Sequence, residues 1–274
     1  MRISRRVAVG SAEPPRWATF VAVALVAIAA ATMVMSSPTP SGARAPEHRV
    51  LFVGDSNALS IFGSVVESPG SRWSVAIATR FGCGVVPYTA VSDGVVLRPL
   101  QPLCGEWDRA RRREIEAQPA DTALLFVGGW EQYDRWVAGS PVPFSSERWL
   151  RLTARDYARV LREMRRSAGD VGIVLNGCHL VPETGLPVET MYQAGRYAPV
   201  INDPARVAAT NAAARRAAEQ AGFPVRVLDL HGFLCRDGFT ETKNGVVLRT
   251  DGLHYTAEGS RLIWTWIKRE IARR

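Results

Sequence analysis

The chain has 274 residues, of which 47% are hydrophobic and 22% charged, and its formal net charge is +8 at pH 7. This composition excludes a disordered or fibrous protein, and the length allows one sizeable core together with additional segments. The positive charge alone does not indicate nucleic-acid binding, because no motif of that class accompanies it, and we expect no nucleic-acid partner.

The first predicted element is an apolar segment, residues 17–35, which contains no charged residue and is long enough to cross a hydrocarbon core as a helix. Four arginines precede it, so the positive-inside rule places residues 1–16 in the cytoplasm and the rest of the chain outside. A cleavable signal peptide is the alternative, since residues 43–45 fit a small-x-small cleavage site, but Pro46 and the long apolar run favour a retained anchor. We therefore expect a single-pass protein of the cell membrane whose folded part is exported.

Residues 36–48 are rich in Pro, Ser and Ala and lack apolar periodicity, which predicts a linker between the bilayer and a domain at 49–274. Within that domain, short β-branched or apolar runs alternate with long amphipathic stretches, as in parallel strands joined by crossover helices. The predicted strands are 50–53, 73–78, 122–127, 171–175 and 225–229, and the predicted helices are 58–66, 106–117, 147–167, 204–221 and 256–272. The fold class that follows is α/β, a three-layer α/β/α sandwich with a five-stranded parallel sheet. Two long segments of little periodicity, 82–104 and 176–203, are expected to be binding loops or lids.

The cysteines are even in number and all lie beyond the anchor, as disulfides in an exported domain require. They are Cys83, Cys104, Cys178 and Cys235. Three pairings are possible; we favour the first with the second, which closes a short loop, and the third with the fourth, which joins two segments that follow predicted strands. Zinc is the competing interpretation because His179 and His231 are nearby, but the spacings typical of zinc ligands do not occur, so we expect no metal and no cofactor.

A candidate nucleophile, Ser56, stands in the tripeptide Gly54-Asp55-Ser56 directly after the first predicted strand. Ligands of parallel sheets bind beyond the carboxyl ends of the strands, and the N-terminus of the following helix offers amides and a positive dipole end to an oxyanion. We therefore expect Ser56 to attack and also to donate to the oxyanion hole, with Asp55 and Asn57 beside the substrate. The alternative is that Ser56 merely caps the helix.

A candidate acid and base occur together in Asp251-Gly252-Leu253-His254, just before the last predicted helix. The glycine allows a tight turn, and the spacing lets the Asp251 carboxylate reach one imidazole nitrogen of His254 while the other nitrogen stays available to a serine. The alternative is a loop histidine without catalytic role. Asp229 and His231 are also close in sequence, but we expect them on opposite faces of a continuing strand and therefore structural.

Together Ser56, Asp251 and His254 resemble the SGNH or GDSL family of serine hydrolases and acyltransferases, which share a flavodoxin-like α/β sandwich and this order of residues. The resemblance spans about residues 49–272, and the lipase elbow Gly-x-Ser-x-Gly is absent. The family's second block supplies an oxyanion glycine, and the matching sequence Gly82-Cys83-Gly84 implies that role for Gly82. The alternative is that this glycine serves only the turn.

The family's third block, Gly-x-Asn-Asp, reads Gly128-Gly129-Trp130-Glu131 here, without the asparagine. Loss of one oxyanion donor costs about 2.7–4 kcal/mol in a serine hydrolase, so either another donor substitutes or the rate is modest. We expect Gly129, Trp130 and Glu131 to bind substrate, with Tyr133 and Trp136 adding sugar-stacking faces. Core packing explains at least one of these aromatic residues equally well.

The tryptophan and the Gly-Cys turn make the chain more similar to exported SGNH domains attached to membrane acyltransferases than to free lipases. This resemblance implies an esterase or O-acyltransferase acting on an acylated carbohydrate or lipid of the cell envelope. Because one anchor helix cannot carry acyl groups across a bilayer, a transferase would need a multi-pass membrane acyltransferase as partner. The alternative is a non-catalytic, membrane-tethered domain that binds glycan or a partner; the missing asparagine supports it, and the intact Ser56, Asp251 and His254 oppose it.

Overall fold

The structure, a computed structural model, describes residues 46–86, 89–92, 94–97, 104–182 and 197–273. The chain divides into two units, Met1–Ala45 and Pro46–Arg274. The predicted anchor at 17–35 lies outside the described residues, as does nearly all of the predicted linker. No helix within the described ranges combines the length and the apolar character that crossing a membrane requires.

A five-stranded parallel sheet forms the centre of the unit Pro46–Arg274, with strand order β2-β1-β5-β8-β9. The strands are β1 (His48–Gly54), β2 (Trp73–Thr79), β5 (Ala120–Phe126), β8 (Ala168–Val174) and β9 (Arg226–Leu228). All five predicted strands are confirmed. Because the chain runs from β1 to β2 on one side and then crosses to β5 on the other, the carboxyl ends of β1 and β5 flank the position where open α/β sheets bind ligands.

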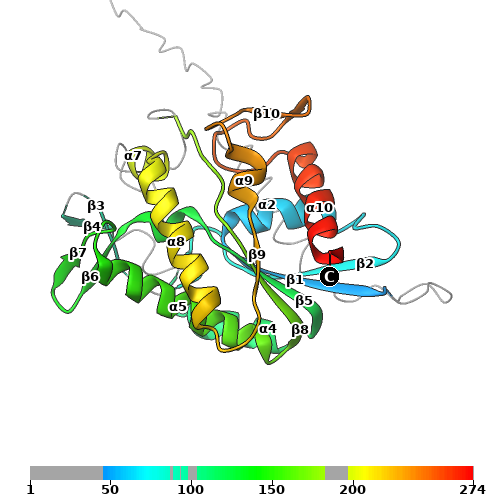
Figure 1. The fold of residues 1–274 in the computed structure, drawn as a ribbon, viewed down its shortest axis with the longest axis horizontal. Helices are drawn as coiled ribbons and strands as arrows, with labels where there is room; N and C mark the ends of the chain where they lie inside the picture. The colour runs from blue at the N-terminus through cyan, green and yellow to red at the C-terminus, as the bar shows by residue number, and fades with distance from the viewer. Residues whose placement is uncertain (1–45, 87–88, 93, 98–103, 183–196, 274) are drawn as a thin grey trace, which may run out of the picture. The chain divides into compact units, whose positions relative to one another are not determined.

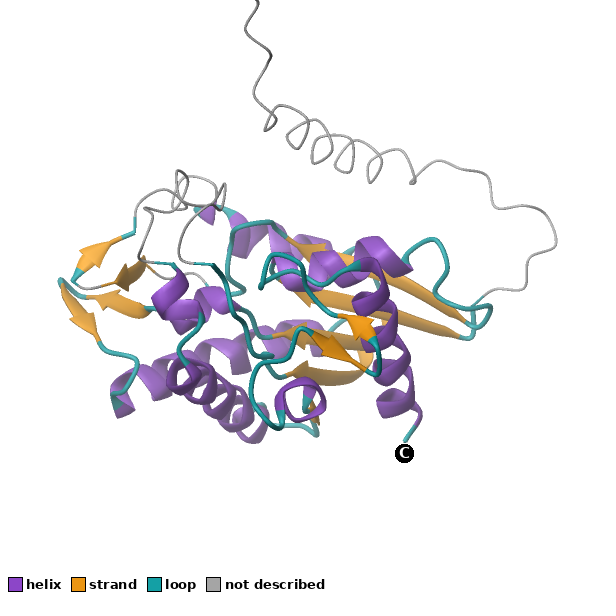
Figure 2. Cartoon of the chain, turned by 90° about the horizontal axis from the view of Figure 1, so that it is seen from above, coloured by secondary structure: helices purple, strands orange, loops and turns teal. Residues whose placement is uncertain are grey.

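Helices cover both faces of this sheet (Figures 1 and 2). One layer is formed by α4 (Trp107–Glu116), α5 (Glu147–Arg165) and α8 (Pro204–Gln220), and the other by α2 (Ser56–Val65), α9 (Leu230–Cys235) and α10 (Ala257–Ala272). Successive side chains of β1 point to opposite faces of the sheet. Leu51 and Val53 therefore pack in the core under the first helix layer, and Val50 and Phe52 in the core under the second. The three-layer α/β/α sandwich and the five predicted helices are confirmed, and α9 is an additional helix.

A second, antiparallel sheet of order β4-β3-β6-β7 lies beside the sandwich (Figure 1) and was not predicted. It contains β3 (Thr89–Ser92), β4 (Val95–Val96), β6 (Asp134–Val137) and β7 (Ser140–Val142). The expectation of an irregular segment at 82–104 is therefore wrong for its middle part. Strands this short contain too few residues to show an alternating pattern.

The remaining described elements are short. They are the 3₁₀ helix η2 (Gly129–Gln132), α7 (Ala198–Ile201), β10 (Thr242–Lys243) and β11 (Val246–Val247). Asp229 caps the N-terminus of α9 by accepting a hydrogen bond from the amide of Gly232, so the strand does not continue to His231 as expected. Both residues nevertheless remain outside the site described below.

Both favoured disulfides are confirmed: Cys83 is bonded to Cys104, and Cys178 to Cys235. Each links parts of the chain that follow different strands, so each fixes a connection at the carboxyl edge of the parallel sheet. Among the described residues, no three His, Cys, Asp or Glu side chains are grouped so that they could hold a metal ion.

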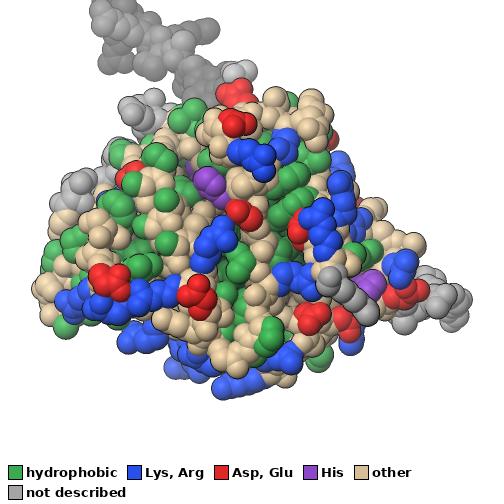
Figure 3. Space-filling model, in the orientation of Figure 1, with side chains coloured by type: hydrophobic (Ala, Val, Ile, Leu, Met, Phe, Trp, Pro, Cys, Tyr) green, Lys and Arg blue, Asp and Glu red, His purple; other side chains and the backbone are tan. Residues whose placement is uncertain are grey.

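Basic and acidic side chains are interspersed on the face drawn in Figure 3. Two of the ion pairs on the outer side of α8 join Arg216 to Glu147 at 2.7 Å and Arg215 to Asp229 at 3.0 Å. Exposed pairs of this kind contribute little stability, about 0–1 kcal/mol each, so they serve chiefly to keep this surface solvated.

Candidate active site

Ser56 lies where β1 ends and α2 begins. A side chain at Gly54 would come within 2.7 Å of the Ala58 Cβ, so glycine permits this tight strand-to-helix turn. Asp55 is the N-cap of α2 and accepts a hydrogen bond from the Asn57 amide at 2.9 Å. The first amides of a helix have no partner within it and lie at the positive end of its dipole, so the surroundings of Ser56 are suited to an oxyanion.

The structure brings Asp251 and His254 to Ser56. His254 Nε2 lies 3.0 Å from Ser56 Oγ, and His254 Nδ1 lies 2.7 Å from Asp251 Oδ2. The loop that holds them depends on Gly252, whose φ is +74° and whose Cβ position would lie 1.9 Å from the Leu180 carbonyl oxygen. Three residues that are distant in sequence thus form one hydrogen-bonded chain.

The charge of Asp251 fixes the tautomer of His254. Burial alone would raise the pKa of Asp251, but the hydrogen bond from the imidazole and those from the amides of Leu253 and His254 outweigh it and lower the pKa to about 2. The ionised carboxylate therefore accepts a hydrogen bond from the Nδ1–H group, and Nε2 is left unprotonated to accept the hydroxyl proton of Ser56. This is the arrangement that a serine nucleophile requires.

Gly82 lies in the segment 80–86, here named the Gly82 loop, which follows the edge strand β2. The amide of Cys83 donates to the carbonyl of Arg80 at 3.3 Å, and Gly82 has a φ of +72°, a turn conformation that glycine adopts without strain. The preceding Phe81 is 53% exposed, and its ring centre lies 6.0 Å from that of His254. The Gly82 loop therefore borders the imidazole.

Asp55 and the glycines that follow β5 hold two strand ends together. Asp55 is buried and accepts hydrogen bonds from the amides of Asn57 and Gly129, while a Cβ on Gly128 would lie 1.8 Å from Asp55 Oδ2. The side chain of Asp55 is thus engaged within the fold, and its contact with substrate stays a prediction. Asn57 is also buried, and Gly129 packs against Ile201; a role for either in substrate binding stays a prediction.

The aromatic residues after β5 belong mainly to a core. Trp130 is 8% exposed and packs on the rings of Tyr133 and Tyr197, with ring centres 6.0 and 5.6 Å apart. These contacts support the alternative of core packing for Trp130 and Tyr133, and the stacking of sugars on their rings stays a prediction. Trp136, on β6, keeps 38% of its surface exposed.

A family model for the SGNH domain, of the kind fused to AT3 domains, matches residues 30–265. The chain belongs to this family. The SGNH/GDSL family consists of serine ester hydrolases, and the fusion to AT3 domains associates it with acyltransferases. The family membership expected from the sequence is thereby confirmed.

Several solved structures are similar to this chain. The acetylxylan esterase Axe2 from Geobacillus stearothermophilus is 16% identical, with a TM-score of 0.46, and the alignment covers 84% of this chain and 96% of that chain. A GDSL-like lipase from Bacteroides thetaiotaomicron VPI-5482 is 12% identical over 89% and 94% of the two chains, with a TM-score of 0.42. LAE5, an α/β-hydrolase from the metagenome of Lake Arreo, Spain, is 13% identical over 83% and 96%, with a TM-score of 0.45. No curated protein sequence matches the chain.

Glu131 of this SGNH domain is 1% exposed, and its predicted contact with substrate stays a prediction. Its Oε1 accepts hydrogen bonds from the amides of Val85 at 2.7 Å and Val86 at 3.4 Å. Burial, and then the charge of Asp55, raise the pKa of Glu131 to about 8, against the opposing effect of these amides. Burial also raises the pKa of Asp55. Glu131 is therefore mainly protonated at neutral pH.

The variant Glu131→Gln is expected to become more stable relative to the wild type as pH rises from 5 to 8. In this range the unfolded chain releases the Glu131 proton, whereas the folded protein keeps it, so the free energy of unfolding of the wild type falls. Each pH unit lowers the free energy of unfolding of the wild type by about 1.4 kcal/mol, so the stability of the variant relative to the wild type increases by on the order of 3 kcal/mol over the range. Urea unfolding at several pH values measures it.

Glu116→Gln, on the exposed side of α4, is the matched control and is expected to give a stability difference from wild type that changes little with pH. If the difference between Glu131→Gln and wild type is equally constant, Glu131 titrates as it does in an unfolded chain and the account of its burial is wrong.

Proposed function

We propose that this protein is an exported, membrane-anchored serine esterase or O-acyltransferase that acts on acyl esters of a cell-envelope glycan or glycolipid. The observation that carries this proposal is the hydrogen-bonded chain from Ser56 through His254 to Asp251. The uncharged segment 17–35 supports anchoring, and the two disulfides support export, because disulfides persist in oxidising compartments.

In the proposed acylation step, Ser56 Oγ forms a bond to the ester carbonyl carbon while His254 Nε2 takes the hydroxyl proton. The negative charge moves to the carbonyl oxygen, which the amides of Ser56 and Gly82 stabilise. Collapse of the tetrahedral intermediate breaks the bond to the alcohol, and His254 returns the proton to the leaving oxygen. Asp251 keeps the imidazole oriented and stabilises its positive charge throughout.

In the second step, water or a sugar hydroxyl attacks the acyl-serine, and His254 again acts first as base and then as acid. Water gives an esterase, and a sugar gives an O-acyltransferase. Phe81 and Leu180 are exposed apolar side chains, one stacked near His254 and the other beside Gly252, and they offer a surface for the acyl group. A transferase would receive its acyl group from a multi-pass membrane acyltransferase.

A fluorophosphonate probe tests the proposal on the purified full chain. We expect covalent labelling of the wild type and of Ser64→Ala, a serine variant in the same helix, and no labelling of Ser56→Ala or His254→Ala. If the folded wild type is not labelled, the proposal fails and a non-catalytic binding domain becomes the better interpretation, as the missing asparagine in 128–131 would also favour.

The acceptor decides between the two enzymatic outcomes. An activated acyl ester is supplied to the wild type together with either water alone or an oligosaccharide of the cell envelope. Release of free acid at the same rate in both mixtures indicates an esterase, whereas an acylated oligosaccharide detected by mass spectrometry indicates a transferase.

A further inference from the structure

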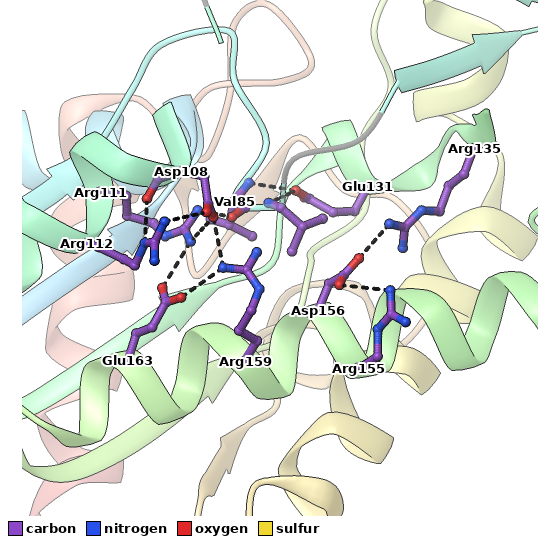
Figure 4. Close-up of polar contacts among 11 residues, drawn as sticks. Val85, Asp108, Arg111, Arg112, Glu131, Arg135, Arg155, Asp156, Arg159 and Glu163 are labelled. Atoms are coloured by element: carbon purple, nitrogen blue, oxygen red, sulfur yellow. Dashed lines mark hydrogen bonds and ion pairs between the residues drawn. The ribbon is translucent and has the colours of Figure 1, made fainter. Parts of the chain in front are cut away.

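The peptide groups of Val85 are bonded to two buried ionisable side chains from different elements (Figure 4). Glu131, in η2, accepts from the Val85 amide at 2.7 Å, and Arg111, in α4, donates from Nη1 to the Val85 carbonyl oxygen. Backbone groups inside a protein are usually satisfied by helices or sheets. Here residues 80–86 have neither, so these side chains supply what regular structure would supply elsewhere.

Arg111 is itself held in place. Its side chain is completely buried, and Nη2 lies 2.6 Å from Asp108 and 3.1 Å from Glu163. Arg159 also binds both acids, at 3.0 and 2.8 Å, and Arg112 pairs with Asp108 at 3.3 Å, so each acid in this network is paired with more than one arginine. A buried charge is tolerated only when it is paired and hydrogen-bonded in this way, and its geometry is correspondingly fixed.

Two further contacts connect this network to the site. Cys83, which is almost completely buried, is tied to Cys104 by a disulfide, and Phe81 stacks near His254. Gly82 lies between them. The segment from Phe81 to Val85 is therefore fixed at Val85 by Glu131 and Arg111 and contacts the imidazole at its other end through the ring of Phe81.

We propose that Glu131 and Arg111 are positioning residues that hold the Gly82 amide toward the oxyanion, an inference that rests on the proposed function. Segment 128–131 lacks the asparagine expected to donate to the oxyanion directly. It supports the oxyanion hole through Glu131 instead, by fixing the loop that carries another donor. Because a displacement of 1 Å in a catalytic group can cost about 100-fold in rate, even a small loosening of this loop has a measurable effect.

The arginine test compares Arg111→Lys with Arg135→Lys in the full chain. Arg135 is also buried and ion-paired, to Asp156 at 2.5 Å, but it lies away from Val85 in Figure 4. For hydrolysis of p-nitrophenyl acetate, we expect Arg111→Lys to lower kcat by about 10- to 100-fold with little change in KM, because an oxyanion forms only after substrate is bound. Affinity for a trifluoromethyl ketone, which forms a tetrahedral adduct, is expected to fall by a similar factor.

Arg135→Lys is expected to retain kcat within about threefold even where it lowers the melting temperature as much as Arg111→Lys does. Equal losses of kcat in the two variants, or a loss in KM alone for Arg111→Lys, would overturn the inference, because either result describes a general effect on folding or binding.

Glu131 provides a second test that does not depend on the folding of Arg111→Lys. Glu131→Gln keeps an oxygen acceptor for the Val85 amide and is expected to retain kcat within about threefold, whereas Glu131→Leu removes the acceptor and is expected to lose about 10- to 100-fold. Hydrogen exchange of the Val85 and Val86 amides is expected to accelerate in Glu131→Leu only. If both variants have equal kcat and equal exchange, the inference is wrong. If the wild type itself neither hydrolyses the ester nor reacts with fluorophosphonate, the proposed function fails, and amide exchange still decides whether Glu131 holds the loop.

Discussion

Asp251→Asn is expected to lower kcat for ester hydrolysis by about 10³- to 10⁴-fold while leaving the fold intact. The asparagine oxygen can still accept from the amides of Leu253 and His254, as Asp251 Oδ1 does at 2.8 and 2.7 Å. The group facing His254 Nδ1 then becomes an amide NH₂, which favours the tautomer protonated on Nε2. That tautomer cannot accept a proton from Ser56, and the loss matches the effect of removing an orienting carboxylate in other serine hydrolases.

Steady-state kinetics with p-nitrophenyl acetate, together with circular dichroism and the melting temperature, measures this effect. Asp121→Asn is the matched control, because Asp121 also accepts from a backbone amide, that of Arg49 at 2.7 Å, but far from the site. We expect this control to retain kcat. A kcat of Asp251→Asn within tenfold of wild type would mean that Asp251 does not orient the catalytic histidine.

Removal of the Cys178–Cys235 disulfide by the double variant Cys178→Ala/Cys235→Ala is expected to cost about 4 kcal/mol of stability. The bond closes a loop with a sequence separation of 57 residues, and on the chain-entropy model the unfolded state gains more freedom the longer the released loop. For a domain of this size the melting temperature is expected to fall by roughly 8–16 °C. Differential scanning calorimetry under non-reducing conditions measures the change.

The Cys83–Cys104 disulfide provides a contrast. Its sequence separation is 21 residues, so the same model gives a smaller loss, about 3 kcal/mol, for Cys83→Ala/Cys104→Ala. Because Cys83 is adjacent to Gly82, we expect this variant to lose more kcat than the other pair although it loses less stability. If the loss of kcat follows the loss of stability in both variants, the disulfide at Cys83 has no particular role in the site.

The parallel sandwich could be predicted because its strands are buried on both faces and its helices are long. Two of the hairpins differ in how clearly the sequence indicates them. β10 and β11 are joined by Asn244-Gly245, both with positive φ, and this pair is the ordinary sequence signal of a two-residue hairpin, so this hairpin could be predicted. β6 and β7 are joined by Ala138-Gly139 in the same conformation, and alanine at the first position carries no such signal.

The Asp251–His254 pair could be predicted, because the two residues are close in sequence and their hydrogen bond depends on that spacing. The role of a side chain such as Glu131 could not be predicted, because it depends on whether the folded chain buries that side chain. A carboxylate after a strand end indicates a ligand contact as readily as a loop support, and only the position of Val85 shows which one Glu131 provides. The burial of Arg111 could have been predicted from the sequence. Arg111 shares a helix face with Trp107 and Ile115 at intervals of four residues, and a charged residue on an apolar face is a candidate for a buried ion pair.

The hydrogen bond between Ser260 in α10 and the Ser60 carbonyl in α2, at 3.3 Å, ties the helix after the nucleophile to the helix after the base. Ile263, Trp264 and Ile267 of α10 complete the second core, so the imidazole is brought within reach of Ser56 by the same docking event that closes that core. We therefore expect the nascent chain to gain esterase activity only once α10 has been synthesised and packed, and a chain that ends before residue 257 to lack both the activity and the completed second core.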